Sequence, residues 1–358
     1  AYFEYIVESG DVSALVADAS AVDATLGGAE VFPSGGALGV AVLPQVFSAA
    51  GLGGAAAVAA VAAGGGGGGA GGAQTTTAVS DLTSAQVAAL STDAFSTLTT
   101  ADLQTLSSAA VAGITSAQVG TLSREEVSAL GTDIANLGSS AISALTSTQV
   151  AALTSVQVGA LQNEDLAKFS STQIQSLSLS GVKALSSAQL SNLGTAQIDK
   201  LTTAQVASLS SAQLAVLTTA QTAKLSTEQL STLTGKQAIG LSTAGLALMT
   251  STQLQSISSA AVGQLTTAQV SALTTDQVDQ LTTAQVKALT TAQMKALSAE
   301  QTAKLTTDQI NTLSGVQVAA LDAGDLANLT ASQVQSLTTS AVAAMTTAQV
   351  AALTTAQA

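Results

Sequence analysis

The sequence predicts an all-α solenoid, a superhelix of short helices of about six residues with one helix in each eight-residue repeat. Three observations lead to this prediction: a hydrophobic residue at every eighth position, a helix-start pattern directly after it, and charges arranged as a short helix would arrange them. A β-solenoid is the alternative, because Thr and Val are also compatible with strands.

The hydrophobic period is the first observation. Stepping by eight from Leu145 to Leu353 gives 27 positions, of which 23 are Leu. The same phase runs from Leu82 to Leu130, and one seven-residue step then leads to Leu137. A continuous α-helix turns about 100° per residue, so successive Leu side chains would lie about 80° apart and scatter over its whole surface. The repeat therefore predicts many short helices.

The residues after each Leu form a helix-start signal. Ser or Thr follows at 24 of the 27 sites, and Gln stands three residues later at 21 of them. Ser/Thr-x-x-Gln is a capping box, in which each side chain binds the other residue's backbone N–H. We expect Thr282 with Gln285, and Thr290 with Gln293, to be such caps.

Charges agree with helices that restart every eight residues. Beyond residue 80, eleven of sixteen acids lie at the second or third helical position, and seven of eight Lys lie in the last two positions before the next Leu. This arrangement complements the dipole of each short helix.

A single octad cannot fold alone, so its Leu and Val must be buried against neighbouring repeats. In the middle of the array, the predicted core residues are Leu273, Val278, Leu281, Val286, Leu289, Met294 and Leu297. Because this core is narrow, lateral packing into a homopolymer or bundle is expected to add stability.

The domain organisation changes before the array. Residues 1–36 are expected to be an N-terminal cap or a docking segment, with Tyr2, Phe3 and Tyr5 as candidate subunit contacts. Residues 64–80 are expected to be a Gly-rich linker, and residues 81–358 the solenoid. The sequence ends inside a repeat, so a continuation of the array beyond residue 358 is an open alternative.

Residues 37–63 are apolar, uncharged and rich in Gly and Ala. We interpret them as a packing segment in which Val40, Val42 and Leu43 contact another subunit. Membrane contact is the less favoured alternative: the segment is long enough to cross a bilayer, but Pro44, Gln45 and the interspersed Gly weaken that interpretation.

The composition argues against catalysis and against most ligands. The chain has no Cys, His or Trp, which removes thiolate nucleophiles, the usual general base and most transition-metal ligands. We therefore expect no enzyme activity, no cofactor and no metal site. A net charge of −13 without a basic patch also argues against nucleic-acid binding.

The phrases "LTTAQVAAL", "LSTEQLSTL" and "LTTDQVDQL" resemble octapeptide-repeat regions of bacterial secreted surface proteins, often labelled adhesin-like or haem-utilisation-like. The Gly/Ala stretch that runs into "AAGGGGGGAGG" is similar to the N-terminal segment of very large bacterial adhesins. This resemblance implies export and a role at the cell surface. The sequence does not support haem binding, because it contains no His or Cys that could ligate the iron.

These observations leave four functions to compare. The leading hypothesis is a structural subunit of an extracellular filament, sheath or surface layer, with other copies of itself as partners and with glycans on Ser and Thr as an option. The second is the extended stalk of a large adhesin. Ice binding through the Thr pairs is the third, but capping explains those residues more simply. An enzyme is the weakest.

Overall fold

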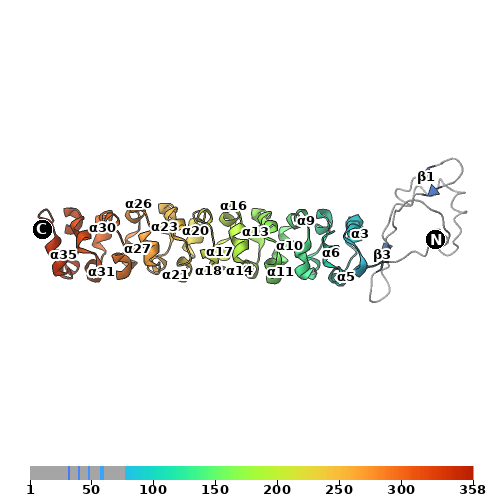
Figure 1. The fold of residues 1–358 in the computed structure, drawn as a ribbon, viewed down its shortest axis with the longest axis horizontal. Helices are drawn as coiled ribbons and strands as arrows, with labels where there is room; N and C mark the ends of the chain where they lie inside the picture. Colours follow the sequence, from blue (N-terminus) through green and yellow to red (C-terminus); the bar gives the residue numbers. More distant parts are fainter. Residues whose placement is uncertain (1–30, 33–38, 41–46, 49–56, 60–76, 358) are drawn as a thin grey trace.

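The computed structural model describes residues 31–32, 39–40, 47–48, 57–59 and 77–357, and from Val79 onward the described chain is a succession of short helices. Figure 1 shows them stacked into a long, straight rod with α35 at one end and α3 near the other. The prediction of an α-helical solenoid is confirmed. The β-solenoid alternative is wrong, because each octad closes i→i−4 backbone hydrogen bonds, such as Val286 N–H to Thr282 O at 3.0 Å.

Two small antiparallel sheets precede the rod. Strand β1 pairs with β2, and β4 lies between β3 and β5. The strands are β1 Val31–Phe32, β2 Gly39–Val40, β3 Phe47–Ser48, β4 Ala57–Ala59 and β5 Thr77–Ala78. The predictions for residues 1–36, 37–63 and 64–80 rest mainly on residues outside the described ranges.

The helices of the rod are four to six residues long, with the following bounds. They are η2 Val79–Asp81, α3 Ser84–Ala89, α4 Thr92–Phe95, α5 Thr100–Thr105, α6 Ser108–Val111, α7 Ser116–Val119, α8 Arg124–Ala129, η3 Gly131–Asn136, α9 Ser139–Ser143, α10 Ser147–Ala152, α11 Ser155–Ala160, α12 Asn163–Ala167, α13 Ser171–Ser176, α14 Leu179–Ala184, α15 Ser187–Asn192, α16 Thr195–Lys200, α17 Thr203–Ser208, α18 Ser211–Ala215, α19 Thr219–Thr222, α20 Thr227–Ser231, α21 Gly235–Ala238, α22 Thr243–Ala247, α23 Ser251–Ser256, α24 Ser259–Val262, α25 Thr267–Ser271, α26 Thr275–Asp279, α27 Thr283–Ala288, α28 Thr291–Lys295, α29 Ala299–Ala303, α30 Thr307–Asn311, α31 Gly315–Ala320, α32 Ala323–Ala327, α33 Ala331–Gln335, α34 Thr339–Ala343 and α35 Thr347–Ala352. The 3-10 helix η2, of three residues, is the one exception to that length range.

Each helix stops because the next Leu leaves the helical conformation. At Leu289, for example, φ is −61° and ψ is 134°, and the following residue, Thr290, is extended as well. The chain therefore changes direction at this Leu, and the next helix begins. We call the extended Leu position between two helices a corner. Each helix packs against the helix three places before it and the helix three places after it, as α27 packs against α24 and α30. A turn of the superhelix therefore takes between three and four octads.

The seven-residue step has its own local structure. Leu130 stays in the helical region with ψ −14° in place of forming a corner, and the 3-10 helix η3 follows. Gly131 adopts φ 53°, a left-handed conformation that favours glycine. A 3-10 helix rises about 2.0 Å per residue, whereas an α-helix rises about 1.5 Å. The longer rise lets η3 connect Leu130 to Leu137 although this repeat has seven residues and not eight. Ile134 stays fully buried, so the core continues through this step.

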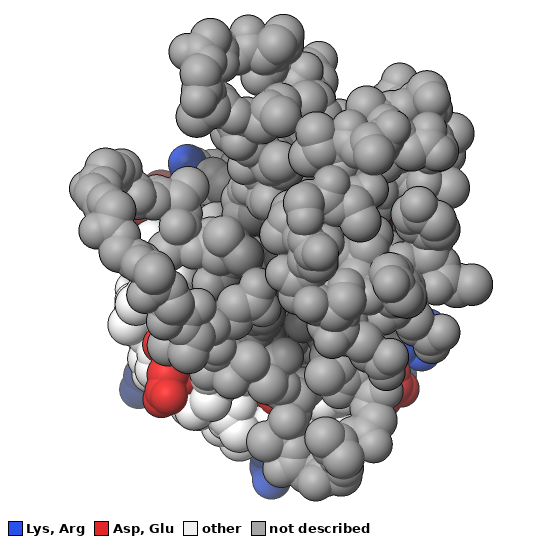
Figure 2. Space-filling view, turned by 90° about the vertical axis from the view of Figure 1, so that its right-hand side faces the viewer, with Lys and Arg blue, Asp and Glu red and all other residues white. Residues whose placement is uncertain are grey.

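The surface of the rod is polar and weakly charged. In a view along the axis, a few acidic and basic side chains are visible at the edge of the rod, in places next to each other (Figure 2). Among the described residues, one ion pair forms, between the neighbouring and exposed Asp199 and Lys200 at 2.9 Å. Such an exposed pair contributes little to stability. None of the described helices is long and apolar enough to cross a membrane.

Candidate functional site: the interface between successive turns

The helix caps are built from the residues that the octad places three apart. The backbone N–H of Gln285 donates to the Thr282 hydroxyl at 3.1 Å, and the backbone N–H of Thr282 donates to Gln285 Oε1 at 2.9 Å. Thr290 and Gln293 make the same two bonds at 3.2 and 2.7 Å. Each box satisfies two N–H groups that a helix start would otherwise leave without a partner.

The seven predicted core residues all lie in the continuous hydrophobic core of the rod. Those on helices are fully buried, and those at corners are nearly so. The helix residues are Val278, Val286 and Met294, and the corner residues are Leu273, Leu281, Leu289 and Leu297. Two layers of apolar side chains thus alternate along the chain, one from the helices and one from the corners.

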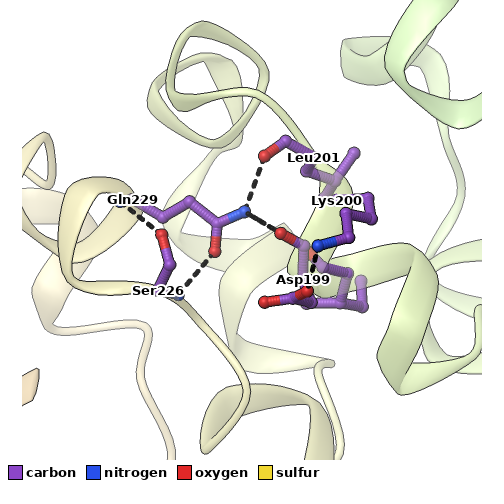
Figure 3. Close-up of polar contacts among 6 residues, drawn as sticks. Asp199, Lys200, Leu201, Ser226 and Gln229 are labelled. Carbon is purple, nitrogen blue, oxygen red and sulfur yellow. Dashed lines mark hydrogen bonds and ion pairs between the residues drawn. The ribbon is translucent and has the colours of Figure 1, made fainter. Parts of the chain in front are cut away.

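From Gln118 onward, the Gln of a cap also binds the preceding turn. Figure 3 shows Gln229 of α20, whose Nε2 donates to the carbonyl oxygens of Leu201 at 2.6 Å and Asp199 at 3.2 Å. Its Oε1 accepts the backbone N–H of Ser226 at 2.7 Å. One side chain therefore fixes the start of its own helix and joins that helix to the Leu201 corner of the preceding turn.

The same bonds recur along the rod. The first is made by Gln118, which donates to the carbonyls of Val87 and Leu90 at 2.8 and 2.9 Å. The last is made by Gln357, which donates to the Leu326 carbonyl at 2.8 Å. We call this series of side chains, at the third position of their helices from residue 118 to residue 357, the glutamine ladder. Its members are mostly buried; Gln285 is 1% exposed.

The corner carbonyls explain why the third position is Gln. The backbone carbonyl oxygen of Ile257, a corner residue, accepts no hydrogen bond from a backbone N–H in the described chain. It accepts one from Gln285 Nε2 at 2.7 Å. A buried carbonyl without a donor is costly. Glu would serve the capping box equally well, but it has no N–H to donate. Glu occurs at none of the 27 third positions from residue 149 onward.

Sequence reasoning missed this second role of Gln. The signal that could have revealed it is the strict preference for Gln over Glu at a position where a cap alone accepts both. The preference indicates that a side-chain donor is needed as well as an acceptor.

Six third positions beyond residue 145 lack Gln, and they recur at a spacing of ten octads. They are Asp165, Gly245 and Asp325, and Gly181, Ala261 and Ala341. The surrounding sequence repeats with them: "STQIQS" starts at residue 171, "STQLQS" at 251 and "ASQVQS" at 331. Ten octads thus form a larger repeat, in which the ladder is interrupted at fixed places.

The interruptions are filled in different ways. Asp165 turns to the preceding turn and accepts the Ser139 hydroxyl at 2.6 Å. At Gly245 a β-carbon would lie 2.5 Å from the Cβ of Thr222, so glycine permits closer packing there. The hydroxyl of Thr222 is itself buried without a partner, as is that of Thr302 one larger repeat later.

Acidic groups divide into two electrostatic environments. The pKa of Glu228 and that of Glu300 are lowered by the backbone N–H groups at the start of their helices, and further by the Ser hydroxyl of the same cap. The pKa of Asp325 is raised by burial, and the neighbouring charges of Asp322 and Glu300 raise it further, while a hydrogen bond from the Asp322 backbone opposes this. Asp325 occupies a ladder position but has no N–H to offer.

The candidate subunit contacts precede the rod in the sequence. Tyr2, Phe3, Tyr5, Val42 and Leu43 fall outside the described residues. Val40 lies in β2, where its backbone pairs with Val31. Among the residues that the structure describes, no cluster of acidic side chains has the arrangement of a metal site.

The family model of the ALTTAQ repeat matches the chain seven times. The matches cover residues 96–132, 132–163, 158–195, 180–211, 191–227, 278–315 and 318–355, which together are more than half of the chain. No curated protein matches the sequence.

Proposed function

Because the chain belongs to the ALTTAQ repeat family, we propose that it is a structural subunit of an extracellular filament, sheath or surface layer. In this role the solenoid is a straight, stiff rod. Other copies of the chain are its partners, and residues 1–36 are its docking segment.

The glutamine ladder is the observation that carries this proposal. Its bonds join successive turns from residue 87 to residue 357. Bending or stretching the rod would separate these amides from the corner carbonyls that they alone serve, as between Gln285 and Ile257. A chain whose repeated side chains resist such separation is suited to bear load along its axis.

The remaining chemistry also supports a structural role. Most acids of the array lie at helix starts, where they complement the helix dipole, and the chain has no His or Cys. We therefore propose a protein without catalytic activity, cofactor or nucleic-acid partner. Exposed Ser and Thr are available for glycans. Ice binding is not proposed, because the first Thr of a pair such as Thr282 and Thr283 is engaged in the cap.

Electron microscopy of the purified chain at high concentration tests the filament. Ordered fibres that contain the rod are expected, and removal of residues 1–36 is expected to abolish them while the rod itself remains folded. Single, monodisperse rods at every concentration would contradict the filament.

A second candidate function is the extended stalk of an adhesin. It is favoured by the straight, extended shape of the rod, which would serve as a spacer (Figure 1). Single rods in the microscope, together with additional octads in the full gene product, would favour the stalk.

A further inference from the structure

The larger repeat places equivalent helices on one side of the rod. Side-chain hydrogen bonds between successive turns join residues from 25 positions apart, such as Gln255 and Gln280, to 31 positions apart, such as Ile198 and Gln229. A third of ten octads falls within this range, so one larger repeat makes three turns. Figure 1 shows the same period: α11, α21 and α31 lie along the lower edge of the rod, and α16 and α26 lie along its upper edge.

Eight helices follow the lower edge from α11 onward. α14 and α18 lie there between α11 and α21 (Figure 1). α24 and α28 stand one larger repeat after α14 and α18, and α34 stands one larger repeat after α24. They pack against α21 and α31 of the same edge. We call the side formed by the octads of α11, α14, α18, α21, α24, α28, α31 and α34 the lysine face.

The lysine face differs in charge from the rest of the rod. It carries Lys183, Lys236 and Lys295, all exposed, and its eight octads contain no Asp or Glu. The other octads from residue 145 onward hold ten acids and five Lys. The division begins after the seven-residue step, because α5, at the same edge nearer the N-terminus, carries Asp102. One side of an acidic rod is therefore positively charged.

Exposed apolar side chains also gather on the lysine face. Val156 on α11 and Val316 on α31 are 65% and 68% exposed and stand two larger repeats apart. Ile239, directly after α21, and Leu179 on α14 are nearly half exposed. Among the described residues before 330, the one other large apolar side chain with such exposure is Leu248 on α22. Apolar residues gathered on one side indicate a surface that a partner covers.

A groove deepens this face beside Lys183. It measures about 490 Å³ and opens between the junction of α14 with α15 and the junction of α17 with α18. Its other lining residues include Ser186, Ser208, Ser210 and Gln213, which are polar and uncharged. The groove gives an acidic side chain of a partner space to approach the Lys183 ammonium group among hydroxyl donors.

The opposite side of the rod carries the complementary charge. α16 and α26, at the upper edge in Figure 1, carry Asp199, Asp276 and Asp279. We call these three residues the acidic edge. Asp199 is paired with Lys200 of its own helix, whereas α26 contains no basic residue beside its two Asp. The acidic edge follows the same three-turn period as the lysine face, because Asp199 and Asp279 stand one larger repeat apart.

We propose that the lysine face docks against the acidic edge of a second copy of the chain, so that rods lie side by side. This inference rests on the proposed structural role and names the contact through which a sheath or layer widens. Opposite charges meet across the contact, and Val156, Ile239 and Val316 are buried against the partner rod. Because the two surfaces lie on opposite sides of one rod, each added rod presents the next free surface, and an open, flat layer results.

Charge selects the acidic edge over a second lysine face. Two lysine faces in contact would bring Lys183, Lys236 and Lys295 of both copies together without any acid on either face. Like charges held together in an interface are unfavourable. The contact is therefore between two different surfaces, and it does not close into a two-fold dimer.

Electron microscopy of the full chain at low and at high salt tests this contact. At low salt we expect layers in which several rods lie side by side. The layers should become narrower at about 1 M salt, where the Debye length falls to about 3 Å and the attraction between the charged surfaces is screened.

A lysine-reversed chain, with Lys183→Glu, Lys236→Glu and Lys295→Glu, should lose the layers, because its lysine face repels the acidic edge. Its matched control makes the same change at three exposed Lys outside the lysine face, namely Lys168→Glu, Lys224→Glu and Lys304→Glu. The control has the same net charge, and its layers should be at least as wide as those of the unchanged chain.

An acid-reversed chain, with Asp199→Lys, Asp276→Lys and Asp279→Lys, should also lose the layers. Mixing it with the lysine-reversed chain should restore them, because each altered surface then meets a surface of opposite charge. Restoration also shows that both altered chains are folded. Layers of unchanged width in either reversed chain alone, or no layers in the mixture, would overturn the proposal.

Other partners give different outcomes. If the unchanged chain stays as single rods and binds vesicles of anionic lipid, whereas the lysine-reversed chain does not, the partner is a lipid surface and the second copy proposed here is wrong. Fibres one rod wide in every chain would overturn the lateral contact and leave the filament function standing. Pairs of rods that return on mixing but never extend further would uphold the contact and contradict the filament function.

Discussion

The side-chain amide of Gln285 donates to the carbonyl oxygen of Ile257 at 2.7 Å, across 28 residues of chain. Its Oε1 simultaneously accepts the backbone N–H of Thr282, three residues before it. The two ends of one amide thus link local helix formation to the stacking of turns. Any substitution that keeps one function and removes the other separates these two contributions.

Gln285→Glu keeps the cap and removes the donor. At neutral pH a buried carboxylate would face the carbonyls of Leu254 and Ile257, so we expect this region to lose about 3 kcal/mol. The loss should shrink as the pH falls, because burial raises the pKa of such a carboxyl and its protonated form can donate. Local opening free energies from hydrogen exchange measure this effect.

Thr282→Ala is the control for that variant. It removes the hydroxyl that accepts from Gln285 N–H but leaves the ladder amide in place, and it should cost only about 1 kcal/mol. Equal losses in the two variants would show that the contact between turns adds nothing beyond the cap.

Thr302→Val should stabilise the rod by about 1 kcal/mol. The Thr302 hydroxyl is buried without a hydrogen-bond partner, and Val has nearly the same shape without the polar group. The reverse change, Val286→Thr, places a hydroxyl in an equally buried position and should destabilise. Chemical denaturation of both variants beside the unchanged chain checks the opposite signs.

Gly240→Ala should destabilise the rod, because a β-carbon there would overlap the backbone carbonyl of Ser211 in the preceding turn. Gly324→Ala is the matched control: a β-carbon at Gly324 meets no atom within 4 Å, and Ala within a helix gains up to about 1 kcal/mol over Gly. Thermal unfolding should therefore shift downward in the first variant and upward in the second. A downward shift in both would contradict the packing described for these two glycines.

Asp325 should make stability depend on pH. Burial raises its folded-state pKa above the ordinary value, so its favourable contribution is fully present below about pH 3.9 and is lost as the pH rises through the raised folded-state pKa. Asp325→Asn removes this dependence, and Asp322 and Glu300 remain in both proteins. The variant should be more stable than the unchanged chain at pH 7, and the difference should close toward pH 3. A difference that does not change with pH would contradict the account.

The local part of this fold can be predicted from the octad because its determinants lie within one repeat. The cap of Thr282 and Gln285 joins residues three apart, and the corner at Leu289 follows from the next cap. The spacing of the turns is different. Neighbouring octads are so alike that Gln285 meets an equivalent corner whichever number of octads makes a turn. The repeat pattern alone therefore does not predict which corner carbonyl the side-chain amide of Gln285 binds.

The structural role of the interruptions in the ladder also cannot be predicted from the pattern within one octad. Gly245 and Thr222 lie in different octads, and they touch because successive turns stack. In sequence each looks like an ordinary deviation from the consensus. Their meaning emerges when the contact between turns is known and the recurrence of Thr222 as Thr302, ten octads later, can be compared with it.

In this structure the ladder amides hold the rod together. The most direct test is cryo-electron microscopy of a chain in which four consecutive ladder residues, Gln269, Gln277, Gln285 and Gln293, are changed to Glu. We predict a bend or a gap in the rod at the turn that contains them, with straight rod on both sides. A rod that stays straight and continuous through this turn at neutral pH would contradict the account.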